Sequence, residues 1–455
     1  MMIQRSRQDG RKRIAVVGSG ISGLSAAWLL GSEHDVCLYD HAARPGGHSN
    51  TVDVPVPGGS IPVDTGFIVY NDVTYPNLTA MFGHLDVPTS ATEMTFAVSL
   101  NQGSIEYSGT DLAGIFAQKR NLFRPKFHGM LWDIWRFYRD APADIGRIGS
   151  ETLGAYLDSK GLGETFRDQH LYPMAAAIWS IPAGCVADYP AAAFLGFCDN
   201  HGLLKITRRP VWRTVKGGSR RYVDKLLAPL QPGLRLGCGV RQVRRDHGCV
   251  VVTDSSGHVD RFDHVVMAAH ADQSLAMLAD ATPRERNILG AFRFNTNRAV
   301  LHSDAALMPK RRKVWSAWNY LTRHVGETGN AAVTYWMNRL QDIPQSPSLF
   351  VTLNPPVEPR ADLVLREEIY EHPIFDSAAL KAQADLWSLQ GEGNTWFCGA
   401  WFGAGFHEDG LQAGLAVAEH LGNVRRPWTV ANESGRIQVG PRRPAFASDL
   451  ELLAS

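Results

Sequence analysis

Residues 14–24 read Ile-Ala-Val-Val-Gly-Ser-Gly-Ile-Ser-Gly-Leu. The first four form an unbroken apolar run, which is typical of a strand buried on both faces of a parallel sheet. Gly18, Gly20 and Gly23 follow with the G-x-G-x-x-G spacing of a dinucleotide-binding loop. In such a loop the first glycine permits a tight turn, the second lets the backbone approach a pyrophosphate, and the third allows close helix–strand packing. With Ser22, which lies inside the loop, they are candidate cofactor-binding residues.

The residues after this loop complete a strand–helix–strand unit. A helical run occupies residues 24–30, and a second apolar strand at residues 36–39 ends at Asp40. The N-terminus of the helix would present free N–H groups and a partial positive charge to phosphates. Asp40 lies about 20 residues beyond the loop, where an acid can bind ribose hydroxyls. All parts of the unit occur in order, which favours a nucleotide site over a chance match, but the pattern does not separate NAD from FAD.

Composition excludes several classes of protein. The 455 residues exceed one ordinary domain of roughly 100–200 residues. A formal net charge of +1 gives no global attraction to nucleic acid, and because the basic segments form no nucleic-acid module we predict no nucleic-acid partner. The six cysteines are scattered without a CxxC or Cys/His cluster, so neither a metal site nor a disulfide scaffold is predicted. This cysteine usage suits a reducing cytoplasm.

No membrane-spanning or secretory segment is expected. The polar, basic residues 1–13 lack the apolar core of a signal peptide. The chain also has no apolar run of about 18 uncharged residues. We therefore expect a cytoplasmic location, and leave open a peripheral contact with the inner face of the membrane.

The turn after the second strand carries a family resemblance. It reads Arg44-Pro-Gly46-Gly47-His48, with Thr51 shortly after. This resembles the flavin amine oxidase and phytoene desaturase superfamily, whose hallmark is an acid, a short spacer, Arg-x-Gly-Gly and a nearby threonine. The resemblance implies FAD, with the arginine pairing a phosphate and the paired glycines bringing backbone N–H groups close to the cofactor. The family usually has arginine where this chain has His48, whose role in phosphate contact, flavin contact or packing stays open.

Three further segments agree with the resemblance. Thr65 and Gly66 belong to a segment similar to the family's Asp-x-Gly, whose backbone passes near the isoalloxazine. Residues 234–240 resemble the strand whose valine, here Val240, meets the adenine. Near the C-terminus a buried strand ends at Gly399 and a helix opens at Asp409-Gly410-Leu411, which in the family points at the flavin. The alternative for this last segment is a capped helix that only closes the domain.

The resemblance implies an α/β fold with α+β insertions, amine-oxidase-like. A Rossmann-type FAD-binding domain with a β-meander would carry an inserted substrate domain, and the active site would lie where the two meet. The predicted ranges are 1–70, 210–280 and 391–425 for the FAD-binding domain, 71–209 and 281–390 for the substrate domain, and 426–455 for a loosely attached tail.

Residues 116–140 of the insertion mix aromatic and basic side chains. Leu131, Trp132, Trp135 and Tyr138 can share one helix face. This face could be a membrane-surface element through which a lipid enters, but we favour an aromatic stripe packed on the core. A second basic run, Lys310-Arg311-Arg312-Lys313, could meet an anionic headgroup or be a solvated loop.

A single dinucleotide fingerprint favours an oxidase or dehydrogenase over a reductase with two dinucleotide domains. The segments Gly405-Phe-His-Glu-Asp-Gly410 and Trp318-Asn319-Tyr320 resemble a bacterial group of FAD-binding proteins found beside cyclopropane-fatty-acid-synthase-like methyltransferases. Some of that group desaturate methylated acyl chains. The resemblance implies an FAD-dependent desaturase of a long apolar substrate, such as a methyl-branched unsaturated fatty acyl chain, with a lipid methyltransferase as a partner. His407 and Tyr320 are the candidate bases, and Asn319 would orient them.

Two alternatives remain. The first is a flavin amine oxidase, which would need an aromatic cage beside the flavin, drawn from Trp318, Tyr320, Trp336 or Trp401. The second is a non-catalytic flavin-binding partner of a lipid methyltransferase.

Overall fold

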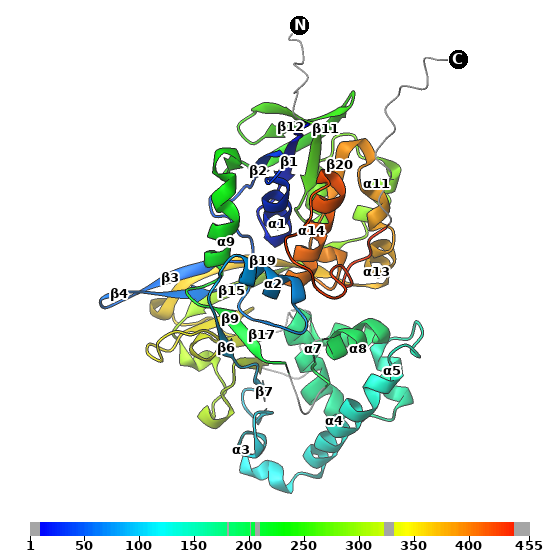
Figure 1. The fold of residues 1–455 in the computed structure, drawn as a ribbon. Coiled ribbons are helices and arrows are strands. Elements are labelled where there is room, and N and C mark those ends of the chain that lie inside the picture. The colour runs from blue at the N-terminus through cyan, green and yellow to red at the C-terminus, as the bar shows by residue number, and fades with distance from the viewer. Residues whose placement is uncertain (1–9, 180–181, 201, 205–209, 323–331, 441–455) are drawn as a thin grey trace. The chain divides into compact units, whose positions relative to one another are not determined.

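The computed structural model describes residues 10–179, 182–200, 202–204, 210–322 and 332–440. Contacts within the chain divide it into two compact units (Figure 1). Unit 1 comprises Met1–Arg44, Pro229–Gly290 and Lys381–Ser455, and unit 2 comprises Pro45–Ala228 and Ala291–Leu380. Residues 45–70 and 210–228, predicted as part of the FAD-binding domain, make their contacts within unit 2.

Unit 1 is built on a five-stranded parallel sheet. Ile14, Ala15 and Val16 in its middle strand are 0% exposed, as expected for a strand covered on both faces. The chain runs from this strand to its neighbour on one side and later returns on the other, so the strand order reverses there and leaves a crevice at the carboxyl ends. In sheet order the strands are β10 (Leu234–Arg235), β2 (Asp35–Tyr39), β1 (Arg13–Val17), β14 (His264–Met267) and β20 (Thr395–Phe397).

Two helices of unit 1 lie side by side because their contact residues are small. Helix α1 (Ile21–Leu30) packs against α14 (His407–Gly422) (Figure 1). A Cβ at Gly414 would lie 2.1 Å from the Ser22 carbonyl oxygen, so only glycine permits this approach. The other helices of the unit are α10 (Ala271–Met277) and α11 (Pro283–Leu289).

The predicted β-meander is present, but its boundaries differ from those predicted. It consists of β11 (Val240–Asp246), β12 (Cys249–Asp254) and β13 (Val259–Phe262), all antiparallel. Residues 234–240 do not form one strand, because Gly237 at φ +67° makes a turn between β10 and β11. Residues 261–269, which the sequence pattern suggests as one strand of the meander, are also divided: β13 ends at Phe262, and β14, which begins at His264, belongs to the parallel sheet.

Unit 2 contains a seven-stranded sheet whose pairs are antiparallel except for one parallel pair, β16 with β7. In sheet order it comprises β19 (Val364–Ile374), β15 (Arg293–His302), β18 (Phe350–Leu353), β17 (Ala332–Trp336), β16 (Trp318–Leu321), β7 (Phe96–Leu100) and β8 (Ile105–Ser108). Smaller sheets are the hairpin β3 (Thr51–Val56) with β4 (Gly59–Asp64), and β5 (Tyr70–Asn71), β9 (Trp212–Val215) and β6 (Thr89–Thr92).

The helices of unit 2 include a group formed by α4, α5, α7 and α8 (Figure 1). The α-helices are α2 (Pro76–His84), α3 (Leu112–Ile115), α4 (Pro125–Asp144), α5 (Leu153–Ser159), α6 (Glu164–Phe166), α7 (Tyr172–Trp179), α8 (Ala191–Asn200), α9 (Arg220–Leu227) and α12 (Met337–Leu340), while α13 (Ser377–Gln383) crosses from unit 2 into unit 1 along the chain. In the described part of the chain, no helix has the length and apolar character needed to cross a membrane.

Helix α4 packs through a different face from the one predicted. Its buried side chains are Phe127, Met130, Phe137 and Ala141. Trp132 is 59% exposed and Trp135 is 40% exposed, so the expectation that their stripe packs on the core is wrong for these two residues.

The predicted loose attachment of the C-terminal tail is wrong for residues 426–440. The Arg426 side chain is buried and donates to the Glu419 carboxylate, with Nε 2.7 Å from Oε1. Arg436 pairs with Asp409 of α14, and Ile437 is also buried. Residues 441–455 lie outside the described part of the chain.

Candidate functional site

The glycine loop after β1 has the geometry that its spacing predicts. Gly18 adopts φ +109°, which favours glycine, and its N–H donates to the Tyr39 carbonyl at 2.8 Å. A Cβ at Gly18 would lie 2.8 Å from the Ala268 carbonyl oxygen, and one at Gly23 would lie 1.8 Å from the Gly18 carbonyl oxygen. Both positions therefore require glycine, the first for its turn and the second for close packing.

The loop also leaves donors free for a phosphate. Among the described residues, the backbone N–H groups of Gly20, Ile21 and Ser22 have no acceptor. Ile21 and Ser22 are each 6% exposed, and buried N–H groups without a partner are costly unless a ligand satisfies them. A Cβ at Gly20 would meet nothing within 4 Å, so open space lies beside these donors. This N-terminus of α1 thus fits the pyrophosphate of a dinucleotide.

Asp40 orients the loop and keeps some capacity for a ribose. Its Oδ2 accepts from the Ser19 backbone N–H at 2.7 Å and from the Ser19 hydroxyl, and its Oδ1 accepts from Ala42 N–H at 2.9 Å. A carboxylate has about four acceptor sites, so a ribose hydroxyl could use the remaining one. The Asp40 carbonyl accepts from Cys238 N–H at 2.8 Å, which places the segment leading to Val240 beside it. The predicted ribose and adenine contacts stay predictions.

The candidate cofactor residues of unit 2 come together around one turn. Gly46 and Gly47 have φ +104° and +56°, a conformation that favours glycine. The His48 carbonyl accepts from Phe67 N–H at 2.7 Å, and a Cβ at Gly66 would lie 2.2 Å from the same oxygen. The structure therefore joins two segments that lie apart in the sequence and that both resemble flavin-binding segments of the superfamily. Thr65 belongs to the second segment, and Arg44 is the last residue of unit 1 before the turn.

The His48 side chain packs against β19. Its ring centroid lies 4.9 Å from that of Tyr370 and 5.4 Å from that of His372. The Tyr370 hydroxyl is 2.7 Å from the Thr65 hydroxyl, so the same tyrosine also touches the second segment. Of the three roles left open for His48, packing is the one that these contacts support. Sequence reasoning missed Tyr370 and His372, whose i, i+2 spacing on a strand is the one signal that they share a face.

Asp64, the residue before Thr65, fixes this arrangement. It is 1% exposed and accepts from the Thr51 hydroxyl at 2.6 Å, the Ser219 hydroxyl at 2.8 Å and the Gln341 amide at 2.8 Å. Burial raises the pKa of Asp64 to about 6, against the effect of these donors. Thr51, part of the family hallmark, thus has a structural task in this chain. Ser219 and Gln341 were not found from the sequence.

Asp409 caps the helix that it opens. It is 0% exposed, and its Oδ2 accepts from Phe406 N–H at 2.7 Å. Arg436 Nε donates to its Oδ1 at 2.6 Å. Burial raises the pKa of Asp409, and the positive charge of Arg436 opposes that rise. The side chain therefore serves the capped-helix alternative, while contacts of Gly410 and Leu411 with the flavin stay predictions. Strand β20 ends at Phe397, two residues before the predicted end at Gly399, whose contact with the cofactor also stays a prediction.

The three catalytic candidates differ in their hydrogen bonding, their burial and the unit in which they lie. Asn319 is 0% exposed, and its amide donates to the Ser316 carbonyl at 2.6 Å and the Thr334 carbonyl at 3.0 Å while accepting from Ser316 N–H at 3.0 Å. This amide holds β16 in place. Tyr320 is buried one residue along β16 and so points to the other face. His407 lies in unit 1, where burial of its ring lowers its pKa to about 3, so it is neutral at pH 7.

The aromatic side chains predicted for an amine cage lie in both units and make separate contacts. Trp318 packs edge-on against Tyr335 across the strand pair, with centroids 4.9 Å apart, and Trp336 packs edge-on against Trp315 at 5.3 Å. Trp401, in unit 1, donates its indole N–H to the Ala269 carbonyl at 3.2 Å. Side chains alternate between the two faces of a strand, so Trp318 and Tyr320 share one face of β16 and Asn319 lies on the opposite face.

Comparison with known proteins gives the family. The solved structures that resemble this chain include a fatty acid isomerase from P. acnes that produces CLA (TM-score 0.63, 16% identity, 90% of this chain and 97% of that one). They also include a putrescine oxidase double mutant with redesigned cofactor binding (TM-score 0.64, 13% identity, 90% and 99%) and cyclohexylamine oxidase from Brevibacterium oxydans (TM-score 0.62, 15% identity, 90% and 99%).

These identities show a shared amine-oxidase-like fold and no more, and no curated protein sequence matches the chain. Residues 21–293 match the family described as flavin containing amine oxidoreductase. That match spans more than half of the 455 residues, FAD is the cofactor typical of this family, and the free donors of the α1 loop fit its pyrophosphate. The chain therefore belongs to the flavin-containing amine oxidoreductase family and is an FAD-dependent oxidoreductase.

Proposed function

We propose that the protein is an FAD-dependent desaturase or dehydrogenase of a long apolar substrate, such as a methyl-branched unsaturated fatty acyl chain. The observation that carries this proposal is the position of His407 as the first residue of α14, in the segment that resembles the bacterial desaturase-like group. Burial lowers the pKa of its ring, which agrees with a neutral base. A fatty acid isomerase among the structures of similar fold is consistent with such a substrate.

A weak, neutral base suits an apolar substrate better than an amine. FAD, when bound, supplies an acceptor for a hydride from the substrate. Loss of hydride from an allylic carbon makes the neighbouring C–H bond strongly acidic, so a base whose pKa is about 3 can accept that proton and leave a new C=C bond. An alkylammonium has a pKa of about 10 and would need a much stronger base. An external acceptor would then reoxidise the cofactor.

Amine oxidation is the second candidate. It is supported by the edge-on pair of Trp318 and Tyr335, which offers aromatic surface on β16 and β17. Putrescine oxidase and cyclohexylamine oxidase are among the structures with a similar fold.

An anaerobic reduction experiment separates the two. Purified protein with bound FAD is mixed with methyl-branched unsaturated acyl chains, their saturated analogues, putrescine or cyclohexylamine, and bleaching of the flavin absorbance is followed. We expect bleaching by the unsaturated acyl chains, and mass spectrometry should show a product that is two hydrogen atoms lighter than the substrate. Bleaching by the amines alone would replace the lipid proposal with amine oxidation.

A further inference from the structure

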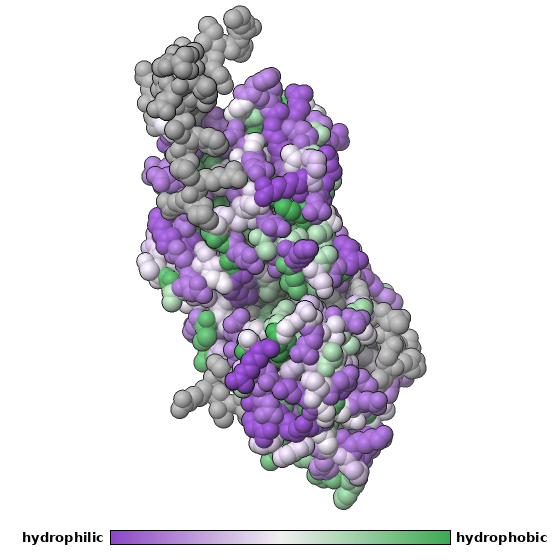
Figure 2. Space-filling view, turned by 90° about the vertical axis from the view of Figure 1, so that its right-hand side faces the viewer, coloured by the Kyte–Doolittle hydropathy of each residue, from purple (hydrophilic) through white to green (hydrophobic). Residues whose placement is uncertain are grey.

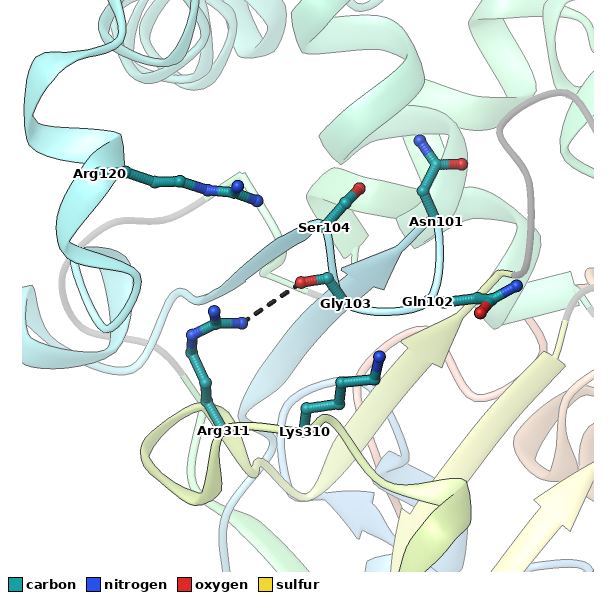
Figure 3. A pocket seen from close by; sticks show the side chains of 7 residues that line it. All are labelled: Asn101, Gln102, Gly103, Ser104, Arg120, Lys310 and Arg311. Atoms are coloured by element: carbon teal, nitrogen blue, oxygen red, sulfur yellow. Dashed lines mark hydrogen bonds between the residues drawn. The ribbon is translucent and has the colours of Figure 1, made fainter.

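An open depression on unit 2 collects positive charge from separate parts of the chain. It has a volume of about 670 Å³ and lies beside the turn between β7 and β8. Arg120 comes from the 3-10 helix Lys119–Phe123, and Lys310 and Arg311 come from the second basic run. In Figure 3 all three side chains point toward the turn, and a dashed line joins Arg311 to the Gly103 carbonyl, 3.3 Å away. The two basic segments of the sequence thus meet at one place.

These charges exceed the acidic groups beside them. Arg311 donates to Glu106, with Nη1 2.6 Å from Oε2, and Glu106 is 0% exposed. That carboxylate balances one cation. For Arg120 and Lys310, the described residues offer no acidic partner. Burial and the nearby charges of Arg124 and Arg311 lower the pKa of Arg120. The depression therefore carries a positive surplus that an anion would relieve.

Exposed apolar side chains sit on the same 3-10 helix as Arg120. Phe123 is 85% exposed, the largest exposed fraction of any large apolar side chain in the described residues, and Leu122 is 46% exposed. Transfer of such side chains from water to an apolar environment is favourable, so a surface that exposes them is a candidate site for contact with a membrane or another protein. Basic residues flank the pair on both sides, namely Lys119, Arg120, Arg124 and Lys126.

Helix α4, which begins at Pro125, continues this character. Trp132 and Trp135 stack on its solvent face with centroids 4.7 Å apart, and the Arg139 guanidinium lies 4.5 Å from the Trp135 ring centroid. Indoles beside cations are typical of side chains at a membrane–water interface. Figure 2 shows hydrophobic residues at the surface among hydrophilic ones at the lower end of the view.

We propose that this surface, defined by Arg120, Leu122, Phe123, Lys310 and Arg311, docks unit 2 on a membrane that carries anionic phospholipid headgroups. The cations would bind headgroup phosphates, while Phe123 and Leu122 would enter the boundary between headgroups and acyl chains. Charge alone would suit a nucleic acid or an acidic protein equally well. The adjacent leucine and phenylalanine, exposed at the centre of the basic stretch, favour a lipid surface. The proposal does not depend on what the flavin oxidises.

Vesicle binding by the full-length protein with its FAD tests the proposal. We expect sedimentation with vesicles of phosphatidylcholine and phosphatidylglycerol but not with phosphatidylcholine alone. Because salt shortens the screening length from about 10 Å at 0.1 M to about 3 Å at 1 M, binding should weaken steeply as salt is added. Equal binding to both kinds of vesicle would overturn the role of the cations.

Variants separate the two components of the surface. Arg120→Gln with Lys310→Gln should lower vesicle affinity about thirtyfold, and Phe123→Ser should lower it on the order of tenfold while the salt dependence stays. Lys225→Gln on α9 and Ile369→Ser on β19, both exposed, are matched controls that should bind as the wild type does. Flavin content and thermal unfolding verify that each variant is folded.

Other partners give different results. Tighter binding to duplex DNA or to poly-glutamate than to anionic vesicles, unchanged by Phe123→Ser, would overturn the membrane assignment. Retention of vesicle binding by the Arg120 and Lys310 double variant would do the same.

Discussion

Breaking the ion pair between Arg436 and Asp409 should be one of the more costly single changes to the stability of unit 1. Replacing Arg436 with methionine keeps much of the apolar stem and removes the charge. In the wild type, Arg436 donates to both carboxylate oxygens, with distances of 2.6 and 3.3 Å, and the backbone N–H groups of Phe406, at 2.7 Å, and Ala404 also donate to the carboxylate. The substitution would leave a carboxylate that is 0% exposed with these backbone bonds as its main compensation.

Removing one partner of a buried pair typically costs about 3–5 kcal/mol, and we expect the lower end because the Arg436 side chain is 18% exposed. The cost should depend on pH. Burial already raises the pKa of Asp409, and loss of the arginine removes the charge that opposes this rise. The folded variant therefore holds its proton to a higher pH than the unfolded chain, so its stability falls as the pH rises. The deficit relative to the wild type should be larger at pH 8 than at pH 5.

Urea unfolding followed by tryptophan fluorescence at both pH values measures this difference. Arg425→Gln is the matched control, because its guanidinium is 50% exposed and pairs with Glu419 and Glu433, so its loss should cost less than about 1 kcal/mol. A deficit for Arg436→Met below about 1 kcal/mol, or one that is equal at pH 5 and pH 8, would refute the reasoning. Combining Arg436→Met with Asp409→Asn should recover much of the loss, because no buried charge then remains.

Three other predictions follow from the same kind of geometry. Gly414→Ala should destabilise unit 1 by about 1–3 kcal/mol or more and release FAD, because the new Cβ would lie 2.1 Å from the Ser22 carbonyl oxygen. Gly83→Ala on α2, where a Cβ would meet nothing within 4 Å, should be neutral or slightly stabilising. Thermal unfolding and flavin content measure both effects. The stability of the wild type relative to Asp64→Asn should fall by about 2 kcal/mol between pH 4 and pH 7, because burial raises the pKa of Asp64 from 3.8 to about 6 and the folded state therefore keeps its proton to a higher pH than the unfolded chain does. A difference in urea unfolding that stays flat over this range would contradict the prediction. Asn319→Ala should cost about 2–4 kcal/mol of stability but leave turnover per bound flavin unchanged, and a large loss of turnover in folded protein would show that the amide does more than hold β16.

The parts of the site that could be predicted from the sequence obey local rules. Gly18, Gly46 and Gly47 adopt positive φ, and Gly23 sits where no Cβ fits, so each glycine is demanded by its own backbone and immediate neighbours. Such positions leave a signal in a few adjacent residues. This is why the loop and the later turn could be predicted from single short stretches.

The parts that could not be predicted depend on distant contacts. Arg436 lies 27 residues beyond its partner Asp409, in a stretch whose composition is typical of a loose tail. Helical periodicity grouped Trp132 and Trp135 correctly on one face, but it cannot tell which face of an amphipathic helix meets the core when aromatic rings occur on both. Tyr370 gave no signal because its task is a contact with residues more than 300 positions away.

Asp64 and Asp409 indicate that the acids in the flavin-binding segments have a structural role in this chain. Both lie in segments similar to ones that approach the flavin, yet both carboxylates are buried and bound by donors of the protein itself. Burial raises the pKa of both acids, to about 6 for Asp64, whose hydrogen-bond donors are neutral, and upward for Asp409 against the opposing charge of Arg436. In each case the backbone of the next residues, Thr65–Gly66 and Gly410–Leu411, is what the side chain holds in place. We therefore expect substitutions of either acid to weaken FAD retention by displacing backbone groups, in proportion to the stability lost, and to leave the absorbance spectrum of the FAD that remains bound unchanged. A spectral shift without loss of stability would instead indicate that the carboxylate touches the cofactor.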